Sequence, residues 1–234
     1  MLKVLKFINT VYERVVTILL IIVLLMVAWC AYDNYYIFNH TLNDSISWYR
    51  PGNNGNNIPS GEKDISDDMV AWLTIYNTDI DYPIMQFTDN VKYLNTDPFG
   101  DYSISGSIFL DSRNSSDFSD QYNIVYGHHM DYNKMFGPLD NYLDAQYLSD
   151  HSFGEILIGK EGSEKYSLEI FASAYCNVND SYIFDTKSSD TDSYIRNIAN
   201  VYNENVNKTD KIICLSTCSD ESYLRIVVFG YLKQ

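Results

Sequence analysis

The feature that most constrains this chain is an uncharged, apolar run of eighteen residues from Val15 to Tyr32, VVTILLIIVLLMVAWCAY. At a rise of about 1.5 Å per residue, a helix of this length nearly spans a hydrocarbon core of about 30 Å. A buried core helix is the alternative, but a helix that is apolar on every face is unusual in a soluble domain of this size. The run therefore predicts a membrane-spanning segment.

The residues on either side of the run predict its orientation. Lys3, Lys6 and Arg14 precede it and Asp33 follows it, so the positive-inside rule places the N-terminus in the cytoplasm and the rest of the chain outside. A cleaved signal peptide would have a shorter apolar stretch ending in a small-x-small site. This run ends in WCAY, which suits an interfacial belt, and we expect an uncleaved single-pass anchor.

The charge of the chain is divided unevenly. The 234 residues carry a net charge of −15, but residues 1–14 have a net charge of +2 and residues 33–234 a net charge of −17. Nucleic-acid binding is excluded, because phosphate contacts require clustered Lys and Arg. A content of 46% hydrophobic and 15% aromatic residues excludes wholesale disorder.

The exported part divides at a linker. PGNNGNNIPSG at 51–61 is rich in turn-forming residues and offers nothing to pack, and we expect a globular domain to begin near Asp64. The predicted order is a cytoplasmic tail (1–14), a transmembrane anchor (15–32), a juxtamembrane segment with linker (33–63) and a globular domain (64–234).

Most of the globular domain reads as β-structure. Short apolar runs separated by turn-forming residues are typical of a sandwich or barrel; they lie at 80–86, 106–111, 122–127, 155–160, 167–175, 211–217 and 223–232. Two helices are expected in addition. SDD at 66–68 can cap a short helix over 69–72, and Asp190–Asn205 has apolar residues spaced by three and four.

Of the four cysteines, Cys218 is the candidate nucleophile. Cys30 lies in the apolar run, and Cys214 cannot pair with Cys218, because four residues along a strand separate Cα atoms by about 13 Å against a limit of about 7 Å. A disulfide from Cys176 to either of these two stays open. Cys218 ends an apolar strand just before the polar SDES, and a thiol at a strand end is partly exposed, as a nucleophile must be.

An arginine follows Cys218 on the next strand. If residues 219–222 form a four-residue loop, Cys218 pairs with Tyr223, and Arg225 projects from the same face about 7–8 Å away. A fixed cation there could stabilise a thiolate or an oxyanion. The alternative is an ordinary surface ion pair at a strand end.

A cysteine nucleophile also needs an acid–base partner that is close in space. His128 and His129 follow the strand YNIVYG, and since adjacent residues on extended chain point in opposite directions, at most one of them faces Cys218. A purely structural role and a metal site formed with Cys214 and Cys218 are the alternatives. CxxxC is not the usual zinc knuckle, and we expect no metal.

Three groups of motifs resemble class B sortases, the membrane-anchored cysteine transpeptidases of Gram-positive bacteria. They are YGHHM (126–130), LSTC (215–218) followed by LRIVVFG (224–230), and DNVKYLN with GSIFLD (89–111). The resemblance covers about residues 64–232. It implies a closed eight-stranded β-barrel with N-terminal helices and a helix before the penultimate strand.

The resemblance also implies the site and its chemistry. Cys218 would attack a C-terminal sorting motif of a secreted protein after Thr, and a cell-wall (peptidoglycan precursor) amine would resolve the thioacyl enzyme, without any cofactor. A hydrolytic cysteine peptidase and a non-catalytic wall-binding module are the alternatives. The implied catalytic residues are Cys218, His128 and Arg225, and the implied substrate-binding residues are Asn90, Leu94 and Ser216.

Overall fold

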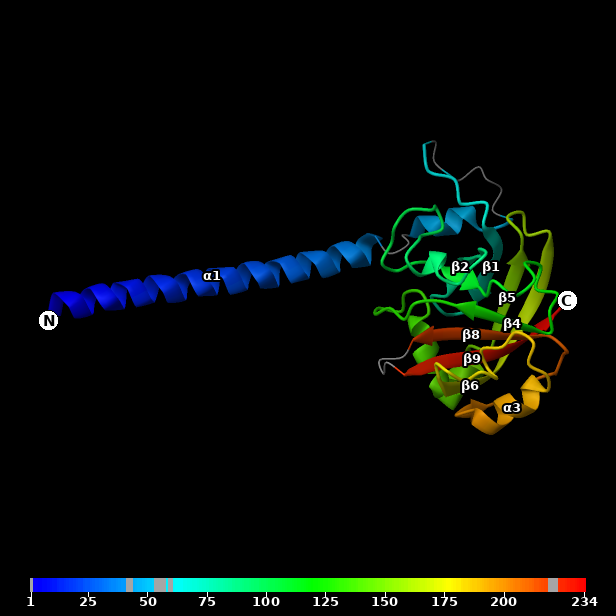
Figure 1. The fold of residues 1–234 in the computed structure, drawn as a ribbon. Coiled ribbons are helices and arrows are strands. Elements are labelled where there is room, and N and C mark those ends of the chain that lie inside the picture. Colours follow the sequence, from blue (N-terminus) through cyan, green and yellow to red (C-terminus); the bar gives the residue numbers. More distant parts are fainter. Residues whose placement is uncertain (1, 41–43, 53–57, 59–60, 219–222) are drawn as a thin grey trace. The chain divides into compact units, whose positions relative to one another are not determined.

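The chain forms two compact units, Met1–Asn43 and Asp44–Gln234 (Figure 1). The computed structural model describes residues 2–40, 44–52, 58, 61–218 and 223–234, and of residues 34, 36–40, 44–45 and 218 the backbone only. The first unit is one helix, α1 (Leu2–His40). Its portion Leu2–Asp33 is long and apolar enough to cross a membrane, with a mean hydropathy of 2.8 over an 18-residue window, and it contains the whole predicted span.

The second unit is a β-barrel. Its strands run in the order β5-β1-β2-β3-β4-β8-β9-β6, and pairing of β5 with β6 closes a ring of eight, while β7 pairs with β6 outside the ring. The mainly β fold and the closed eight-stranded barrel are thereby confirmed. The strands are β1 (Met69–Ile75), β2 (Asp81–Met85), β3 (Ile108–Leu110), β4 (Tyr122–Tyr126), β5 (Phe153–Ile158), β6 (Glu164–Asn177), β7 (Val201–Tyr202), β8 (Ile212–Cys218) and β9 (Leu224–Lys233).

Short helices precede the first strand or join later ones. They are η1 (Asp44–Tyr49), η3 (Lys92–Leu94), η4 (Gly137–Leu143), α2 (Ala145–Asp150) and α3 (Thr191–Ile198). Helix α3 packs on the outer face of β6, β8 and β9 through Ile195, and the chain that precedes it packs there through Ile183. Both side chains are fully buried. This layer covers the face beside which the candidate site lies.

The prediction of a helix over 69–72 is wrong, because this run is strand β1. Six of its seven residues are buried, and it pairs with β2 on one edge and β5 on the other. Trp72 Nε1 and Thr74 Oγ1 both donate to Asp81 Oδ1 at 2.7 Å. A short apolar run is compatible with either structure, and here pairing on both edges decides for the strand.

The predicted helix over Asp190–Asn205 ends early, at Ile198. Tyr202 belongs instead to β7, where it pairs with Ala172 of β6 and packs its ring edge-on against Phe171. Asp190 takes the N-cap position, but with φ of 55° and no side-chain hydrogen bond to the helix. Ladder pairing thus shortens a helix whose residue spacing favours a longer one.

The globular unit includes residues that we assigned to the juxtamembrane segment. Arg50 forms ion pairs with Glu155 on β5 and Asp81 on β2 at 2.6 and 3.5 Å, and η1 precedes it directly. Part of the predicted linker, residues 53–57 and 59–60, lies outside the described residues. The compact unit begins at Asp44, and the functional boundary at residue 64 stays a prediction.

Candidate active site

The backbone of the barrel brings Cys218 next to Arg225. The β8–β9 register pairs these two residues directly, whereas we expected Cys218 to pair with Tyr223. A shift of two residues leaves every side chain on its original face, so hydrophobic alternation could not distinguish the two registers. The predicted loop 219–222 lies outside the described residues, as does the Cys218 side chain.

The parallel pairing of β4 with β8 brings His128 to the same edge of the sheet. Tyr126 pairs with Ser216, and the Gly127 amide donates to the Ser216 carbonyl at 3.1 Å. His128 follows Tyr126 by two positions, and Cys218 follows Ser216 by two positions. Because parallel strands run in the same direction, both residues lie where the two strands end.

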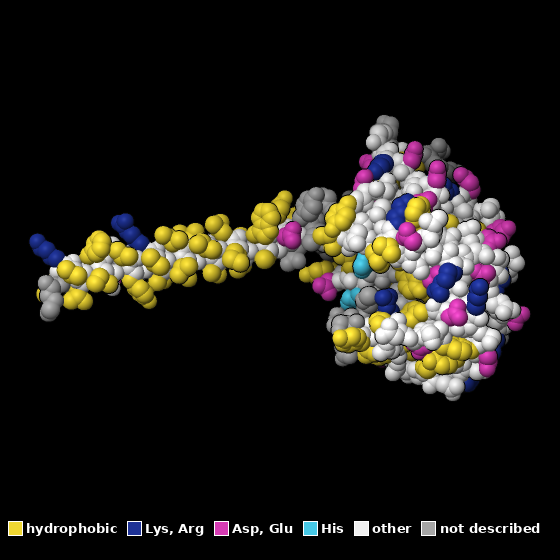
Figure 2. Space-filling model, viewed as in Figure 1, with side chains coloured by type: hydrophobic (Ala, Val, Ile, Leu, Met, Phe, Trp, Pro, Cys, Tyr) yellow, Lys and Arg dark blue, Asp and Glu magenta, His cyan; other side chains and the backbone are white. Residues whose placement is uncertain are grey.

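A cavity of about 270 Å³ opens beside this edge. Its lining includes four of the six residues that the resemblance implied and five that it did not. The lining residues are Asn90, Leu94, Phe109, Tyr126, Gly127, His128, Val178, Phe184 and Arg225. Figure 2 shows histidine side chains at the surface of the globular unit beside hydrophobic ones.

The ring of His128 is held by a main-chain carbonyl. Its Nε2 lies 2.7 Å from the carbonyl oxygen of Leu94, and since a carbonyl oxygen can only accept, Nε2 carries a proton. Nδ1 is therefore the nitrogen that can take up or release a proton. This geometry makes Leu94 a positioning residue for His128 as well as part of the cavity wall.

The neighbouring His129 has a different environment. Its Nε2 lies 2.7 Å from Asp140 Oδ2, so the two adjacent histidines have separate partners, as extended chain requires. The Cys214 side chain is fully buried in the core. Within the described part of the chain, no group of three or more His, Cys, Asp or Glu side chains could hold a metal ion.

Arg225 is half-buried between two other strands and an aromatic ring. On β9 it pairs with Cys218 on one side and with Cys176 of β6 on the other, and its Cζ lies 5.8 Å from the centre of the Phe184 ring. No ion pair of Arg225 is found among the described residues, so the surface ion pair that we considered is not formed there.

Cys176 and Cys214 are free thiols. Desolvation by burial raises the pKa of Cys176 to about 12, with the Asp180 charge adding to the increase and Arg225 opposing it. Desolvation also raises the pKa of Cys214 well above its usual range. Both thiols are therefore held in the protonated form, which is the unreactive form of cysteine, at neutral pH.

Both polar groups of the Asn90 side chain form hydrogen bonds within the protein. Its Nδ2 donates to Asp111 Oδ2 at 3.0 Å, and its Oδ1 accepts from the Ser112 amide at 2.7 Å. Ser216 does not line the cavity: its side chain is fully buried, and its Oγ has no hydrogen-bond partner among the described residues. The substrate-binding roles of Asn90, Leu94 and Ser216 stay predictions.

Most of the cavity-lining residues that we did not predict have apolar side chains. Tyr126 and Gly127 lie inside the YGHHM motif, but Val178 and Phe184 come from the chain between β6 and α3, which has no periodic signal.

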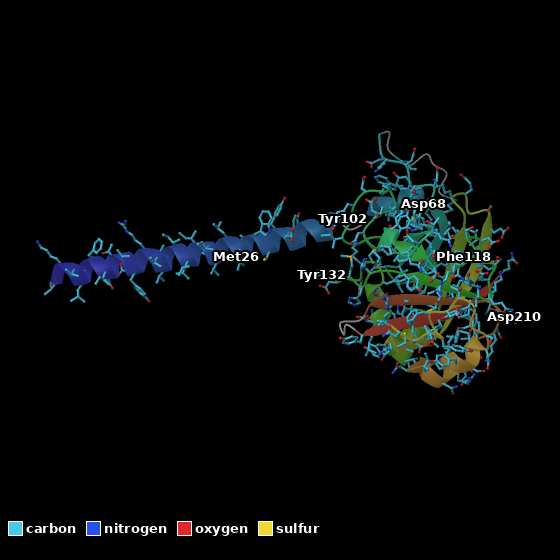
Figure 3. The ribbon with its side chains drawn as sticks, in the orientation of Figure 1. Met26, Asp68, Tyr102, Phe118, Tyr132 and Asp210 are labelled. Atoms are coloured by element: carbon cyan, nitrogen blue, oxygen red, sulfur yellow. The ribbon has the colours of Figure 1, made fainter. Side chains whose placement is uncertain are left out.

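Tyr102 and Tyr132, 79% and 77% exposed, project on one side of the globular unit (Figure 3). They follow the cavity residues Leu94 and His128 in the chain.

The closed eight-stranded barrel is the fold that the resemblance implied, and its backbone pairs Cys218 with Arg225. The family model described as "Sortase domain" matches residues 73–233. The chain therefore belongs to the sortase family, whose members are cysteine transpeptidases.

Relatives narrow the family to class B. The chain is 38% identical over 178 residues to Sortase B of Listeria monocytogenes, covering 72% of this chain and 71% of that protein. It resembles a Staphylococcus aureus sortase B–substrate complex with a TM-score of 0.65 and 31% identity over 73% of this chain and 82% of that one. It also resembles a Sortase B complexed with triglycine, with a TM-score of 0.63 and 32% identity over 71% and 81% of the two chains.

Proposed function

We propose that this cell-wall transpeptidase cleaves a C-terminal sorting motif of secreted proteins after Thr and transfers them to a peptidoglycan precursor amine. The observation that carries the proposal is the direct pairing of Cys218 with Arg225 at the edge where His128 lines the cavity. The similar sortase B of Staphylococcus aureus is known as a complex with its substrate, and the first substrate that we propose here is a peptide.

In the acylation step, the Cys218 thiolate attacks the carbonyl carbon of Thr. Arg225, the cation beside Cys218, stabilises the oxyanion or holds the backbone of the motif. The C–N bond then breaks, and the departing amine takes a proton from His128. Because Nε2 donates to the Leu94 carbonyl, Nδ1 is the atom that supplies this proton.

In the transfer step, the acceptor amine attacks the thioester carbon and loses a proton to Nδ1 of His128, and the Cys218 thiolate departs. The new amide bond replaces the one that was broken, so no cofactor is consumed. The triglycine complex of a similar Sortase B supports a glycine-containing amine as acceptor.

We further propose that α1 is a single-pass anchor with its N-terminus in the cytoplasm. Lys3, Lys6 and Arg14 precede the apolar run, and this excess of positive charge is typical of a cytoplasmic end. An anchor raises the effective concentration of the site near lipid-linked acceptors and emerging substrates.

The test uses the full chain in detergent micelles with a peptide library, each product being identified by mass spectrometry with and without triglycine. We expect cleavage after Thr and a triglycine adduct on the Thr-containing fragment. Cys218→Ala, His128→Ala and Arg225→Ala should each abolish turnover. Cys176→Ala, His129→Ala and Arg196→Gln are the matched controls, because their side chains do not line the cavity.

Two outcomes would contradict the proposal. Hydrolysed product only, at every triglycine concentration, would make the protein a peptidase. Peptide binding without any cleavage, unchanged in Cys218→Ala, would make it a wall-binding module.

A further inference from the structure

A fully buried carboxylate lies behind the cavity. The Asp111 side chain, directly after β3, is 0% exposed. Arg113 donates to it from Nε and Nη2 at 2.8 Å each and from its amide at 2.9 Å. Asn90 Nδ2 and the Tyr126 hydroxyl donate to Asp111 Oδ2 at 3.0 Å each. Side chains from two cavity walls therefore converge on one charge.

Arg113 extends this network to a third wall. Its Nη2 also donates to the main-chain carbonyl of Phe184 at 2.8 Å. Phe184 lies in the 178–190 segment, which joins β6 to α3. The preceding carbonyl, that of Ile183, accepts from the buried Tyr122 hydroxyl at 2.9 Å, so two consecutive carbonyls of the segment are held from the barrel.

The position of Phe184 matters because of its ring. The ring stacks on Tyr126 with a centroid distance of 6.4 Å and an interplanar angle of 26°, and it lies 5.8 Å from Cζ of Arg225. All three side chains line the cavity. A displaced Phe184 carbonyl would move the ring away from Arg225 and change the cavity wall.

We propose that Arg113 is a positioning residue, which Asp111 orients so that it fixes the 178–190 segment and holds Phe184 against Arg225. This inference rests on the proposed function, in which a peptide occupies the cavity. Arg113 itself does not line the cavity, so it acts through Phe184. Since Asp111 fixes the guanidinium through two parallel hydrogen bonds, its orientation is set before any peptide arrives.

A double-mutant cycle tests whether Arg113 acts through Phe184. It compares the full-length wild type in detergent with Arg113→Gln, Phe184→Ala and the double variant, using a cleaved peptide from the library. We expect Arg113→Gln to lower kcat/KM about tenfold, the factor carried by one hydrogen bond to a charged group. The loss should lie mainly in KM, and the double variant should be no worse than Phe184→Ala.

Two further readouts separate positioning from general damage. Alkylation of Cys218 by iodoacetamide should keep its rate within about twofold, while amide hydrogen exchange over 178–190 should become faster. Arg196→Gln is the matched control, because Arg196 is a similarly exposed arginine that pairs with Glu204 and packs on Tyr202 away from the cavity. Arg196→Gln should change neither the alkylation rate of Cys218 nor the amide hydrogen exchange over 178–190.

Losses that multiply in the double variant would overturn the proposal, since Arg113 would then act independently of Phe184, for example on the peptide itself. Unchanged exchange over 178–190 in Arg113→Gln would overturn it as well. If Arg113→Gln fails to fold because Asp111 is left unpaired, Asp111→Asn with Arg113→Gln removes the buried charge and takes its place. A wild type without peptide turnover would contradict the proposed function, while the exchange comparison would still decide this inference.

Discussion

Gly127 connects the packing of the barrel to the position of His128. A Cβ at Gly127 would lie 2.4 Å from Ile108 Cδ1 and 2.7 Å from Phe136 Cδ2, whereas carbon atoms in contact are about 3.5–4.0 Å apart. Ile108 and Phe136 are 1% and 0% exposed, so each could give way only by moving within the core. Gly127→Ala must therefore displace buried side chains or the strand that carries His128.

Overpacking of this kind costs about 1–3 kcal/mol. For a domain of this size, each kcal/mol lowers the thermal midpoint by about 2–4 °C, so we expect a decrease of about 2 to 12 °C in Gly127→Ala. The measurement is thermal unfolding of the full chain in detergent, followed by near-ultraviolet circular dichroism. Peptide turnover should fall as well, because His128 is the next residue.

The control removes the atom that a Cβ would meet first. Ile108→Val lacks Cδ1 and costs about 0.5–1.5 kcal/mol by itself. Combined with Gly127→Ala, it should restore part of the lost midpoint, so that the double variant is more stable than the sum of the single effects predicts. A midpoint equal to that of the wild type in Gly127→Ala, or strictly additive losses in the double variant, would refute the reasoning.

Two other perturbations have defined outcomes. Burial acts to raise the pKa of Asp111, but hydrogen bonds from Arg113 and Tyr126 and the Arg113 charge hold this pKa below its ordinary value of 3.8. The ionised form of Asp111 therefore stabilises the folded state above about pH 4, and this stabilisation is lost at lower pH. The unfolding free energy of Asp111→Asn should accordingly be lower than that of the wild type at pH 6, with a difference that shrinks toward pH 3 in urea titrations; a constant difference would contradict this. Cys176→Ser should keep peptide turnover and iodoacetamide labelling of Cys218 within about twofold, because the Cys176 thiol is buried and protonated, and labelling at Cys176 in the wild type would contradict this interpretation.

The sequence was sufficient for the class of fold because strand runs and turn-forming residues alternate along the domain. It was insufficient for β1, since MVAWLTI carries apolar residues at almost every position and shows neither period. Only the presence of β2 and β5 on its two edges makes it a strand. Similarly, spacing favoured a helix through Tyr202, but pairing with β6 ends it.

The candidate site shows the same limit at the level of single residues. Spacing placed Arg225 on the face of Cys218 but two residues away, because the register depends on the whole β8–β9 pair, from Ile212 with Tyr231 onward. The choice of His128 over His129 came only from the family resemblance. The contribution of Phe184 could not be predicted, since it depends on a contact between Arg113 and a carbonyl 71 residues further along the chain.

Ser216 shows how a residue outside the cavity can still serve the site. Its buried Oγ has no hydrogen-bond partner among the described residues, and an unsatisfied buried hydroxyl costs about 1–3 kcal/mol. Its main-chain carbonyl, in contrast, accepts from the Gly127 amide at 3.1 Å, and so fixes the residue before His128. Any residue at this position could supply that carbonyl, because it is a main-chain group. Ser216 therefore serves the site through its backbone, which holds the Gly127 amide, while its fully buried side chain lies outside the cavity lining.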